Sequence, residues 1–273
     1  MKNAVSNIAW SSEQDAAMYR QLQALGIRGL EAAPTRFFPE QPYSLEHCRQ
    51  AEKLREHLKR AYGLSVISLQ SIWYGRQEQL FRSAEERAIL LDYTKRAIDF
   101  ADSLHCPNLV FGSPRNRVGG GRHLEEAREF FRAVGEYAHA HGTVVAIEPN
   151  PAIYQTDFLT TTQEALRFVR ALDAPGIAVN LDIGTMVANG ESVDAWMGFQ
   201  QWIHHVHISE PYLAEIVPRA LHGEVCRRLE NMGYRGYVSL EMKQSSKPVA
   251  WSTSLQYVLG IRKSKGKASH EAG

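Results

Sequence analysis

Four residues of metal-binding type stand at or near the ends of strand-like runs in the second half of the sequence. They are Glu148, Asp182, His207 and Glu241, and successive members lie 34, 25 and 34 residues apart. Each step has about the length of one strand and one helix, so the four side chains are expected to meet at one end of a parallel barrel. Three carboxylates and one imidazole suit a single hard divalent cation; Mn²⁺ is favoured, with Mg²⁺, Co²⁺ and Zn²⁺ as alternatives. Such a site assists proton transfer beside a carbonyl group.

Each of these acids, taken alone, has an ordinary structural alternative. An Asp or Glu at a strand end often caps the next helix or pairs with an arginine. Four such residues at corresponding positions on consecutive strands favour metal binding instead. His205 lies two residues before His207, so both side chains face the same side of the strand. We predict that His205 lies one layer deeper and supports the site without binding the ion.

Short apolar runs alternate with longer amphipathic runs along the chain. Eight strands are predicted, at residues 5–10, 27–31, 65–70, 108–111, 143–148, 177–182, 203–208 and 237–241. Helices are predicted near residues 13–25, 45–62, 84–104, 124–141, 162–172, 192–200, 218–232 and 249–262. This alternation indicates parallel βαβ units, and eight units favour an α/β fold of the (β/α)8 TIM-barrel type. The barrel is predicted to span residues 1–263 as a single domain, followed by a disordered polar tail at 264–273.

Composition narrows the classes of partner. The 273 residues suit one barrel, and 31 Lys and Arg against 30 Asp and Glu give no global field that would attract nucleic acid or an anionic membrane. No apolar stretch approaches the length of a membrane span, and the start of the sequence lacks the apolar segment of a signal peptide. The three cysteines are far apart and form no CxxC pair. We therefore expect a cytoplasmic protein that acts on a small molecule and binds neither nucleic acid nor membrane, and a homo-oligomer remains open.

Several short motifs resemble the xylose isomerase-like TIM-barrel superfamily, near the sugar phosphate isomerases and epimerases and the ketose 3-epimerases. The resemblance extends over residues 3–262 and is most specific between 143 and 243. The motifs are Ile147-Glu148-Pro149-Asn150, Tyr154-Gln155-Thr156-Asp157-Phe158-Leu159, Leu181-Asp182-Ile183-Gly184, His205-Val206-His207-Ile208-Ser209-Glu210 and Leu240-Glu241.

The resemblance implies both a metal site and a reaction. A Glu, Asp, His, Glu quartet binds one divalent ion in that family, and the matching residues here are Glu148, Asp182, His207 and Glu241. The two glutamates of the family also act as an acid–base pair on opposite faces of the substrate carbon. The expected activity is therefore isomerisation or epimerisation of a sugar or sugar derivative, through an enediolate whose charge the metal stabilises.

The sequence departs from the ketose 3-epimerase pattern around the substrate. Thr185 replaces a histidine of that pattern, Tyr154 replaces an acidic residue, and Leu213 replaces an arginine. Two alternatives therefore stay open: a metal-dependent dehydratase of a polyol or keto-acid, and a sugar-binding member without catalysis. Another branch, the type IV AP endonucleases, requires additional histidines for three zinc ions. The corresponding segments, Gln70-Ser71-Ile72 and Gly112-Ser113-Pro114, have none.

Residues in the loops after the strands are the candidates for contact with the substrate. Arginines there suit a phosphate or carboxylate, an aromatic ring suits a sugar face, and a lysine near the last strand suits an anionic intermediate. Ordinary surface or packing roles remain the alternative for each. The predicted substrate-binding residues are Trp73, Arg115, Arg117, Thr185, Glu210 and Lys243.

Overall fold

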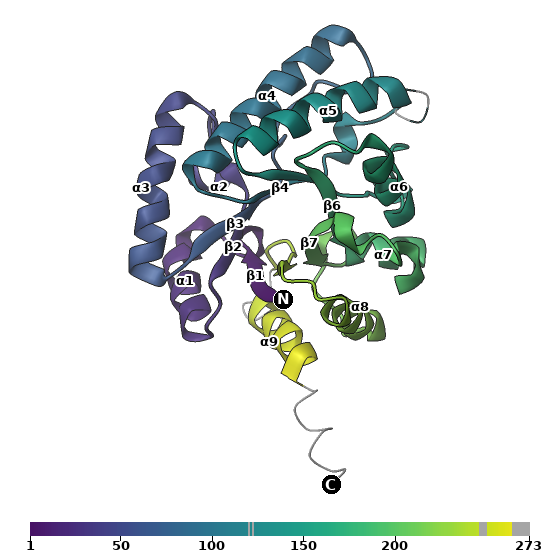
Figure 1. Ribbon diagram of the computed structural model, residues 1–273. Coiled ribbons are helices and arrows are strands. Elements are labelled where there is room, and N and C mark those ends of the chain that lie inside the picture. Colours follow the sequence, from purple (N-terminus) through teal and green to yellow (C-terminus); the bar gives the residue numbers. More distant parts are fainter. Residues whose placement is uncertain (120, 122, 246–249, 264–273) are drawn as a thin grey trace.

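The computed structural model is a closed barrel of parallel strands surrounded by helices (Figure 1). It describes residues 1–119, 121, 123–245 and 250–263, so the predicted tail at 264–273 lies outside the described residues. The strands are β1 (Lys2–Ser6), β2 (Gly29–Ala32), β3 (Ser65–Leu69), β4 (Asn108–Phe111), β5 (Val144–Ile147), β6 (Ile177–Asp182), β7 (Ile203–Ile208) and β8 (Tyr237–Leu240). Each strand pairs with the next in chain order, and β8 closes the barrel on β1 through pairs such as Val5 with Leu240. The predicted TIM barrel is confirmed.

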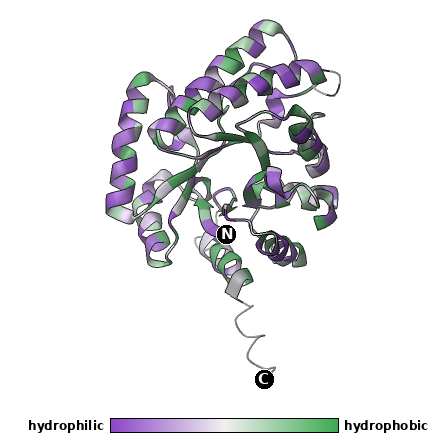
Figure 2. Ribbon diagram, in the orientation of Figure 1, coloured by the Kyte–Doolittle hydropathy of each residue, from purple (hydrophilic) through white to green (hydrophobic). Residues whose placement is uncertain are grey.

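Helices connect the strands on the outside of the barrel. The α-helices are α1 (Asp15–Ala24), α2 (Pro34–Phe37), α3 (Leu45–Tyr62), α4 (Ala84–Ser103), α5 (Leu124–Ala140), α6 (Thr162–Leu172), α7 (Ile183–Asn189), α8 (Ala220–Asn231) and α9 (Ala250–Lys263). Short 3-10 helices are η1 (Asn7–Ala9), η2 (Ser12–Gln14), η3 (Pro114–Asn116), η5 (Ala152–Tyr154), η6 (Val193–Trp196), η7 (Gln200–Trp202) and η8 (Pro211–Leu213). Figure 2 shows hydrophobic residues along the strands and mixed faces on the outer helices, as a packed α/β barrel requires.

Local sequence signals fix the ends of several helices. Ser44 accepts a hydrogen bond from the His47 amide at the start of α3, and Gly63 ends that helix in a left-handed conformation with φ 66°. At the start of α6, Thr161 and Glu164 form a reciprocal capping box. Such caps satisfy backbone groups that a helix end leaves without partners. The predicted ranges of α3 and α6 therefore agree with the structure.

The first predicted strand is displaced. Strand β1 ends at Ser6, whereas residues 5–10 were predicted, and the chain turns into η1 directly afterwards. The turn is held by side chains, because Asn7 Oδ1 accepts a hydrogen bond from the Ala33 amide and Arg36 donates to the Trp10 carbonyl oxygen at 2.7 Å. These contacts join residues far apart in the sequence, and the local pattern does not reveal them.

The helix predicted at residues 192–200 is wrong. Helix α7 instead begins at Ile183, immediately after β6, and ends at Gly190 with φ 65°. Asp182 caps it by accepting a hydrogen bond from the Thr185 amide. The predicted segment contains only the short helix η6 and the start of η7. A strand that leads into a helix without a loop makes Asp182 both the end of β6 and the cap of α7.

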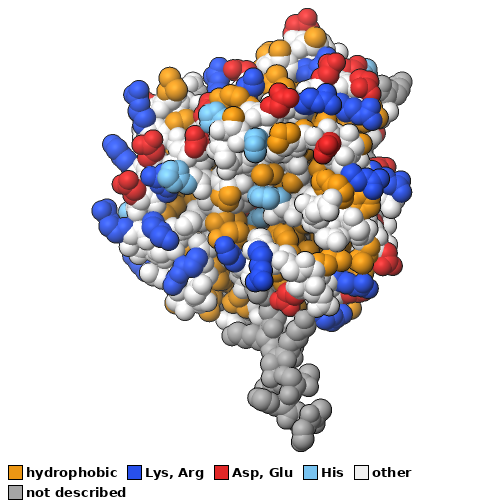
Figure 3. Space-filling model, viewed as in Figure 1, with side chains coloured by type: hydrophobic (Ala, Val, Ile, Leu, Met, Phe, Trp, Pro, Cys, Tyr) orange, Lys and Arg blue, Asp and Glu red, His pale blue; other side chains and the backbone are white. Residues whose placement is uncertain are grey.

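The surface carries both signs of charge, interspersed with hydrophobic side chains, on the face shown in Figure 3. Among the described residues, no helix has the length and hydrophobicity needed to cross a membrane. Helix α9 contacts α8 and β8 next to the point where the barrel closes.

Candidate metal centre

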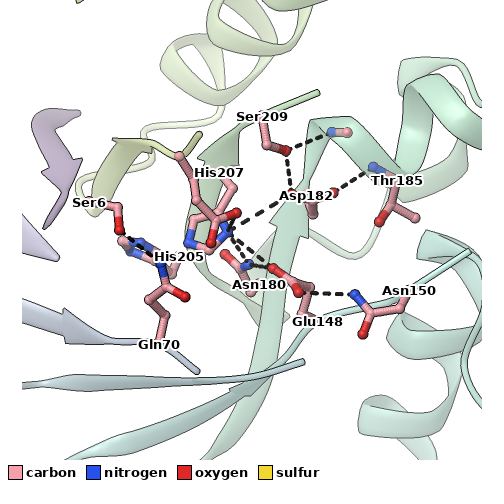
Figure 4. A network of polar contacts seen from close by, with 12 residues as sticks. Ser6, Gln70, Glu148, Asn150, Asn180, Asp182, Thr185, His205, His207 and Ser209 are labelled. Atoms are coloured by element: carbon pink, nitrogen blue, oxygen red, sulfur yellow. Dashed lines mark hydrogen bonds and ion pairs between the residues drawn. The ribbon is translucent and has the colours of Figure 1, made fainter. Parts of the chain in front are cut away.

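The carboxyl ends of β5 to β8 bring the four predicted metal ligands together. Figure 4 labels three of them, Glu148, Asp182 and His207. Glu148 and Glu241 directly follow β5 and β8, Asp182 ends β6, and His207 is the next-to-last residue of β7. One ligand atom from each lies within 4.8 Å of the others. His207 Nδ1 is 3.1 Å from Glu148 Oε1, 3.1 Å from Glu241 Oε2 and 3.9 Å from Asp182 Oδ2. The arrangement is compact enough for all four to hold one ion.

Two of the three carboxylates have raised pKa values, whereas the hydrogen bond and charge of His207 outweigh burial and lower the pKa of Glu148. Burial raises the pKa of Asp182 to about 6, and the charge of Glu148 adds to the rise. Burial also raises the pKa of Glu241 to about 7, with Glu148 and Glu31 contributing. Crowded buried acids keep protons because their charges are poorly solvated and repel one another. A divalent cation among them would offset both effects.

His207 is oriented for binding through Nδ1. Burial alone would lower its pKa, but Glu241 and Glu31 hold that pKa well above its usual value. Its Nδ1 faces the three carboxylates, while its Nε2 lies 2.9 Å from Glu31 Oε1. Metal-binding histidines commonly use one ring nitrogen for the ion and donate the other N–H to a carboxylate. The same division here would make Nδ1 the ligand atom for an ion and Nε2–H the donor to Glu31.

Glu31, from β2, is a site residue that the sequence reasoning missed. It is fully buried and accepts a hydrogen bond from Ser68 Oγ at 2.8 Å, in addition to its contact with His207. His205 Nε2 lies 3.4 Å from the same oxygen, so this histidine sits behind the ligand His207. A signal was available, because the second predicted strand ended on Glu31 just as later strands end near Glu148 and Asp182.

Replacing Glu31 with Gln is expected to weaken metal binding by about 10- to 100-fold, the usual effect of losing a carboxylate that orients a metal-binding histidine. The amide keeps the shape of the side chain but not the charge that stabilises the His207 N–H. Isothermal titration with Mn²⁺ would measure the change. Glu136→Gln, an exposed substitution on α5, is the matched control. Unchanged affinity in the Glu31 variant would show that Glu31 does not act through His207.

Three polar side chains hold Glu148 in place. Asn180 Nδ2 donates to Glu148 Oε1 at 2.8 Å, and Asn150 Nδ2 donates to Oε2 at 3.0 Å. Arg117 is fully buried and donates to Asn150 Oδ1 at 2.6 Å and to the Glu148 carbonyl oxygen at 2.8 Å. Burial lowers the pKa of Arg117 to about 10, which leaves it charged at neutral pH. Arg117 was predicted to bind substrate, but these contacts place it behind the ligand.

Asp182 is fixed from two sides. Its Oδ1 accepts from the Thr185 amide, and its Oδ2 accepts from Ser209 Oγ at 2.5 Å. Ser209 Oγ in turn accepts from the Gly184 amide at 2.9 Å. The Thr185 hydroxyl, another predicted substrate contact, donates to the Pro149 carbonyl oxygen at 2.8 Å and is buried. Thr185 therefore supports the site and does not face the cavity, and Asp182 combines helix capping with its place among the ligands.

A cavity of about 460 Å³ opens above the carboxylates of the site. The residues that line it come from loops after several strands, as expected of the C-terminal face of a TIM barrel. They are Gln70, Ser71, Val110, Gly112, Ser113, Pro114, Glu148, Asn150, Tyr154, Asp182, Ser209, Glu210, Tyr212, Leu213, Glu241 and Lys243. Of the predicted substrate-binding residues, this set contains Glu210 and Lys243. The volume of the cavity is suited to a small organic molecule.

Two of the predicted substrate contacts lie elsewhere. The Trp73 side chain is 2% exposed, donates from Nε1 to Thr94 Oγ1 at 2.9 Å and packs against Phe111 with ring centroids 4.6 Å apart. It therefore packs between the barrel and α4. Arg115 is exposed and lines a separate surface depression next to Arg82. The sequence placed both in loops near the site but did not give the directions of their side chains.

The two predicted residues that do line the cavity differ in their contacts. Glu210 is 3% exposed and forms a bidentate ion pair with Arg219, whose Nε lies 2.8 Å from Oε1 and whose Nη2 lies 2.7 Å from Oε2. Its negative charge is thus compensated within the loop after β7. Lys243 has an exposed side chain, and its backbone amide donates to the Leu213 carbonyl oxygen at 2.9 Å. This backbone bond joins the loops after β7 and β8.

Two tyrosines form part of the cavity wall. Tyr154 Oη accepts a hydrogen bond from the Tyr212 amide at 2.7 Å, and the two rings meet edge to face with centroids 5.5 Å apart. Burial, with further contributions from Asp182, Glu148 and Glu241, raises the pKa of Tyr154 to about 12, so its phenol keeps its proton. Tyr212 and Leu213 have left-handed backbones with φ 60° and 53°. Backbone strain of this kind is concentrated at binding sites.

The fold and the buried ligand set define a barrel with a candidate metal centre at its C-terminal face. The family model for xylose isomerase-like TIM barrels matches residues 19–260. The chain therefore belongs to the xylose isomerase-like TIM-barrel family. The search of curated proteins found no match.

Similar solved structures agree with this assignment at the level of the fold. The 3-keto-D-glucoside 4-epimerase of E. coli has a TM-score of 0.75 and 18% identity, covering 96% of this chain and 99% of that chain. The D-psicose 3-epimerase of Clostridium cellulolyticum H10, with D-tagatose, has a TM-score of 0.76 and 17% identity, covering 97% and 98%. An AP endonuclease of family 2 from Brucella melitensis has a TM-score of 0.69 and 20% identity, covering 93% and 98%.

Proposed function

We propose that this protein is a divalent-metal-dependent isomerase or epimerase of a sugar or sugar derivative. The observation that carries the proposal is the compact cluster of Glu148, Asp182, His207 and Glu241, whose three carboxylates line a ligand-sized cavity. Two similar structures are epimerases of keto sugars by name, which supports the same class of reaction. A purely structural role would not require three carboxylates that face a cavity beside a buried histidine.

In this proposal the two glutamates transfer protons on different sides of the substrate carbon. They follow β5 and β8, three strand positions apart around the barrel, and both approach His207 Nδ1 to 3.1 Å. One carboxylate removes the proton beside a carbonyl, and the other returns a proton to the opposite face or to the neighbouring carbon. A metal ion held by the four ligands would supply positive charge next to the developing enediolate oxygen. Asn150, Asn180 and Arg117 keep Glu148 in position for this role.

The metal content of purified protein tests the site. Elemental analysis is expected to find about one divalent ion per chain in the wild type, because the four ligand atoms converge on one point. Asp182→Ala removes one ligand and is expected to lose most of that ion, whereas the surface variant Glu136→Gln keeps it. Wild-type protein without metal, and without uptake of Mn²⁺, Co²⁺ or Zn²⁺, would overturn the proposal.

The reaction itself is tested by exchange of substrate protons with D₂O. Metal-loaded protein would be incubated with ketoses, sugar phosphates and keto-glycosides, and the products analysed by NMR and mass spectrometry. The expected result is deuterium at the carbon beside the carbonyl, in a product of otherwise unchanged composition. Loss of water from the product would indicate the dehydratase alternative. Binding of sugars without any exchange would indicate a non-catalytic member of the family.

A further inference from the structure

A second cavity, of about 350 Å³, lies at the end of the barrel opposite the candidate metal centre. Its lining includes the first residues of β1, β4, β7 and β8, which are Lys2, Asn108, Ile203 and Tyr237. Because all strands of the barrel are parallel, these residues mark its amino end, whereas the predicted metal ligands stand at its carboxyl end. The volume lies in the range of small-molecule pockets, and the proposed reaction makes no use of this cavity.

The side chains of fixed charge at this cavity are cationic. Lys2 and Arg235 are exposed, and the described residues that line the cavity include no Asp or Glu. Lys2 Nζ lies 5.2 Å from the centre of the Tyr237 ring, a cation–π contact that keeps the ammonium group beside the cavity. Neither cation forms an ion pair within the described part of the chain. Two unpaired cations at a concave site attract an anion.

A chain of hydrogen bonds leads from this cavity to the candidate metal centre. Glu31 Oε1 lies 2.9 Å from His207 Nε2 and accepts a hydrogen bond from Ser68 Oγ at 2.8 Å. Because the Ser68 hydroxyl donates to Glu31, it accepts from Asn108 Nδ2, which lies 2.9 Å away. The amide oxygen of Asn108 then accepts from His204 Nδ1 at 2.8 Å. Every donor between His204 and Glu31 therefore points toward Glu31, and hydrogen bonds aligned in this way polarise one another.

His204, which lines the cavity, presents a hydrogen-bond acceptor to it. Burial lowers the pKa of His204 to about 4, so at pH 7 the ring is neutral and carries one proton, the one that Nδ1 donates to Asn108. The other ring nitrogen, Nε2, is then an acceptor. It has no partner among the described residues, and it is not one of their buried unpaired atoms, so solvent reaches it. A ligand that fits this cavity therefore brings a negative charge for Lys2 and Arg235 and a hydroxyl donor for Nε2.

We propose that this cavity is an effector site for a small anion that also carries hydroxyl groups, and that the bound anion weakens metal binding at the other end of the barrel. The anion site itself does not depend on the proposed function, whereas its effect does. A ligand hydroxyl that donates to His204 Nε2 withdraws electron density from the ring, so Nδ1–H becomes a stronger donor. Passed along the chain of hydrogen bonds, this change makes Ser68 donate more strongly to Glu31. Glu31 then supports the His207 N–H less, and His207 becomes a less basic metal ligand.

Calorimetry on metal-free protein tests the anion site, with D-glucose 6-phosphate, inorganic phosphate and D-glucose as probes. D-Glucose 6-phosphate is expected to bind about tenfold more tightly than phosphate, the effect of one added hydrogen bond, and D-glucose more weakly than either. Arg235→Gln is expected to weaken binding of the sugar phosphate by about tenfold, because it removes a charge-assisted contact. The control Arg49→Gln, an exposed substitution on α3, should keep the wild-type affinity. Absence of binding, or binding that Arg235→Gln leaves unchanged, would overturn the inference and leave the proposed reaction untouched.

Titration with Mn²⁺, with and without saturating D-glucose 6-phosphate, tests the effect of the anion. The Mn²⁺ affinity is expected to fall by about fivefold when the anion is bound, the lower end of typical couplings, and Mn²⁺ should weaken anion binding by the same factor. Ser68→Ala interrupts the chain of hydrogen bonds but leaves the cavity lining intact, so the anion should still bind and the effect on Mn²⁺ should disappear.

An unchanged Mn²⁺ affinity with the anion bound, or a coupling that survives Ser68→Ala, would overturn the effector role. If the wild type binds no Mn²⁺ at all, the proposed function and the effector role fail together, while calorimetry on the metal-free protein still decides whether the anion site exists.

Discussion

The Glu241→Gln enzyme is expected to lose turnover by about 10³-fold or more, the contribution typical of a residue that transfers the reacting proton. Gln keeps an oxygen that can face the metal but cannot exchange a proton with carbon. The three ligands Glu148, Asp182 and His207 remain, so metal should still bind. Parallel measurements of kcat and of metal content would separate the two roles. Near-normal turnover in a metal-loaded Glu241→Gln protein would refute the acid–base assignment.

Replacing either glutamate should also change the selectivity of deuterium exchange in a different way. If each serves one face of the substrate carbon, Glu241→Gln still allows Glu148 to remove and return the proton on its own face. Deuterium would then enter one epimer without conversion to the other, and Glu148→Gln would show the opposite selectivity. Glu136→Gln should behave as wild type. Loss of exchange with both epimers in one variant, with both retained in the other, would indicate that one glutamate alone handles the proton.

The order of strands and helices could be predicted from the sequence, because each element has its own local pattern of apolar residues. The predicted ranges 108–111, 177–182 and 203–208 coincide with β4, β6 and β7, since buried parallel strands give continuous apolar runs with clear ends. The displaced β1 and the unrecognised start of α7 share a cause. Side chains of Asn7 and Asp182 determine where the backbone turns, and their partners lie in other elements or in the following turn.

The convergence of the four candidate ligands could be predicted for a related reason. Residues at the carboxyl ends of barrel strands point into one shared mouth, so strand-end chemistry converges whatever the loops do. The same rule extends to Glu31 at β2, whose partner His207 comes from the far side of the barrel. Glu31 was missed because the sequence reasoning considered only the four consecutive strands β5 to β8.

The residues around the cavity were harder to predict from the sequence, because side chains in loops follow no periodic pattern. Trp73 turns into the core while Tyr212 turns toward the cavity, and neither direction follows from residue type. The left-handed backbone of Tyr212 and Leu213 is an even clearer case, since sequence gives no reason to expect it at two bulky residues. Tyr154 was recognised only as a departure from the family pattern, and the structure gives it a partner in Tyr212.

Protons would compete with the proposed metal ion for the same side chains, and this competition predicts a pH dependence. The folded-state pKa values of Asp182, about 6, and Glu241, about 7, lie above the ordinary values of 3.8 and 4.5, and the pKa of His207 is raised as well. Groups with raised pKa values stabilise the metal-free fold at low pH, and this contribution is lost as pH rises through the folded-state values. Between pH 5 and 8 all three groups therefore act in the same direction.

Mn²⁺ affinity is expected to be at least about hundredfold weaker at pH 6 than at pH 8, because binding must displace the proton of His207 and, increasingly below pH 7, that of Glu241. One displaced proton gives a tenfold change per pH unit, and two units give the stated factor. The rise in melting temperature on adding Mn²⁺ should accordingly be larger at pH 8. Calorimetry in two buffers of different ionisation enthalpy would count the protons released. The half-buried His204 and the buried His222, whose pKa values burial lowers to about 4, lie outside the ligand set, so their effects cancel between measurements with and without metal. An affinity independent of pH would mean that the site is already deprotonated before the metal arrives.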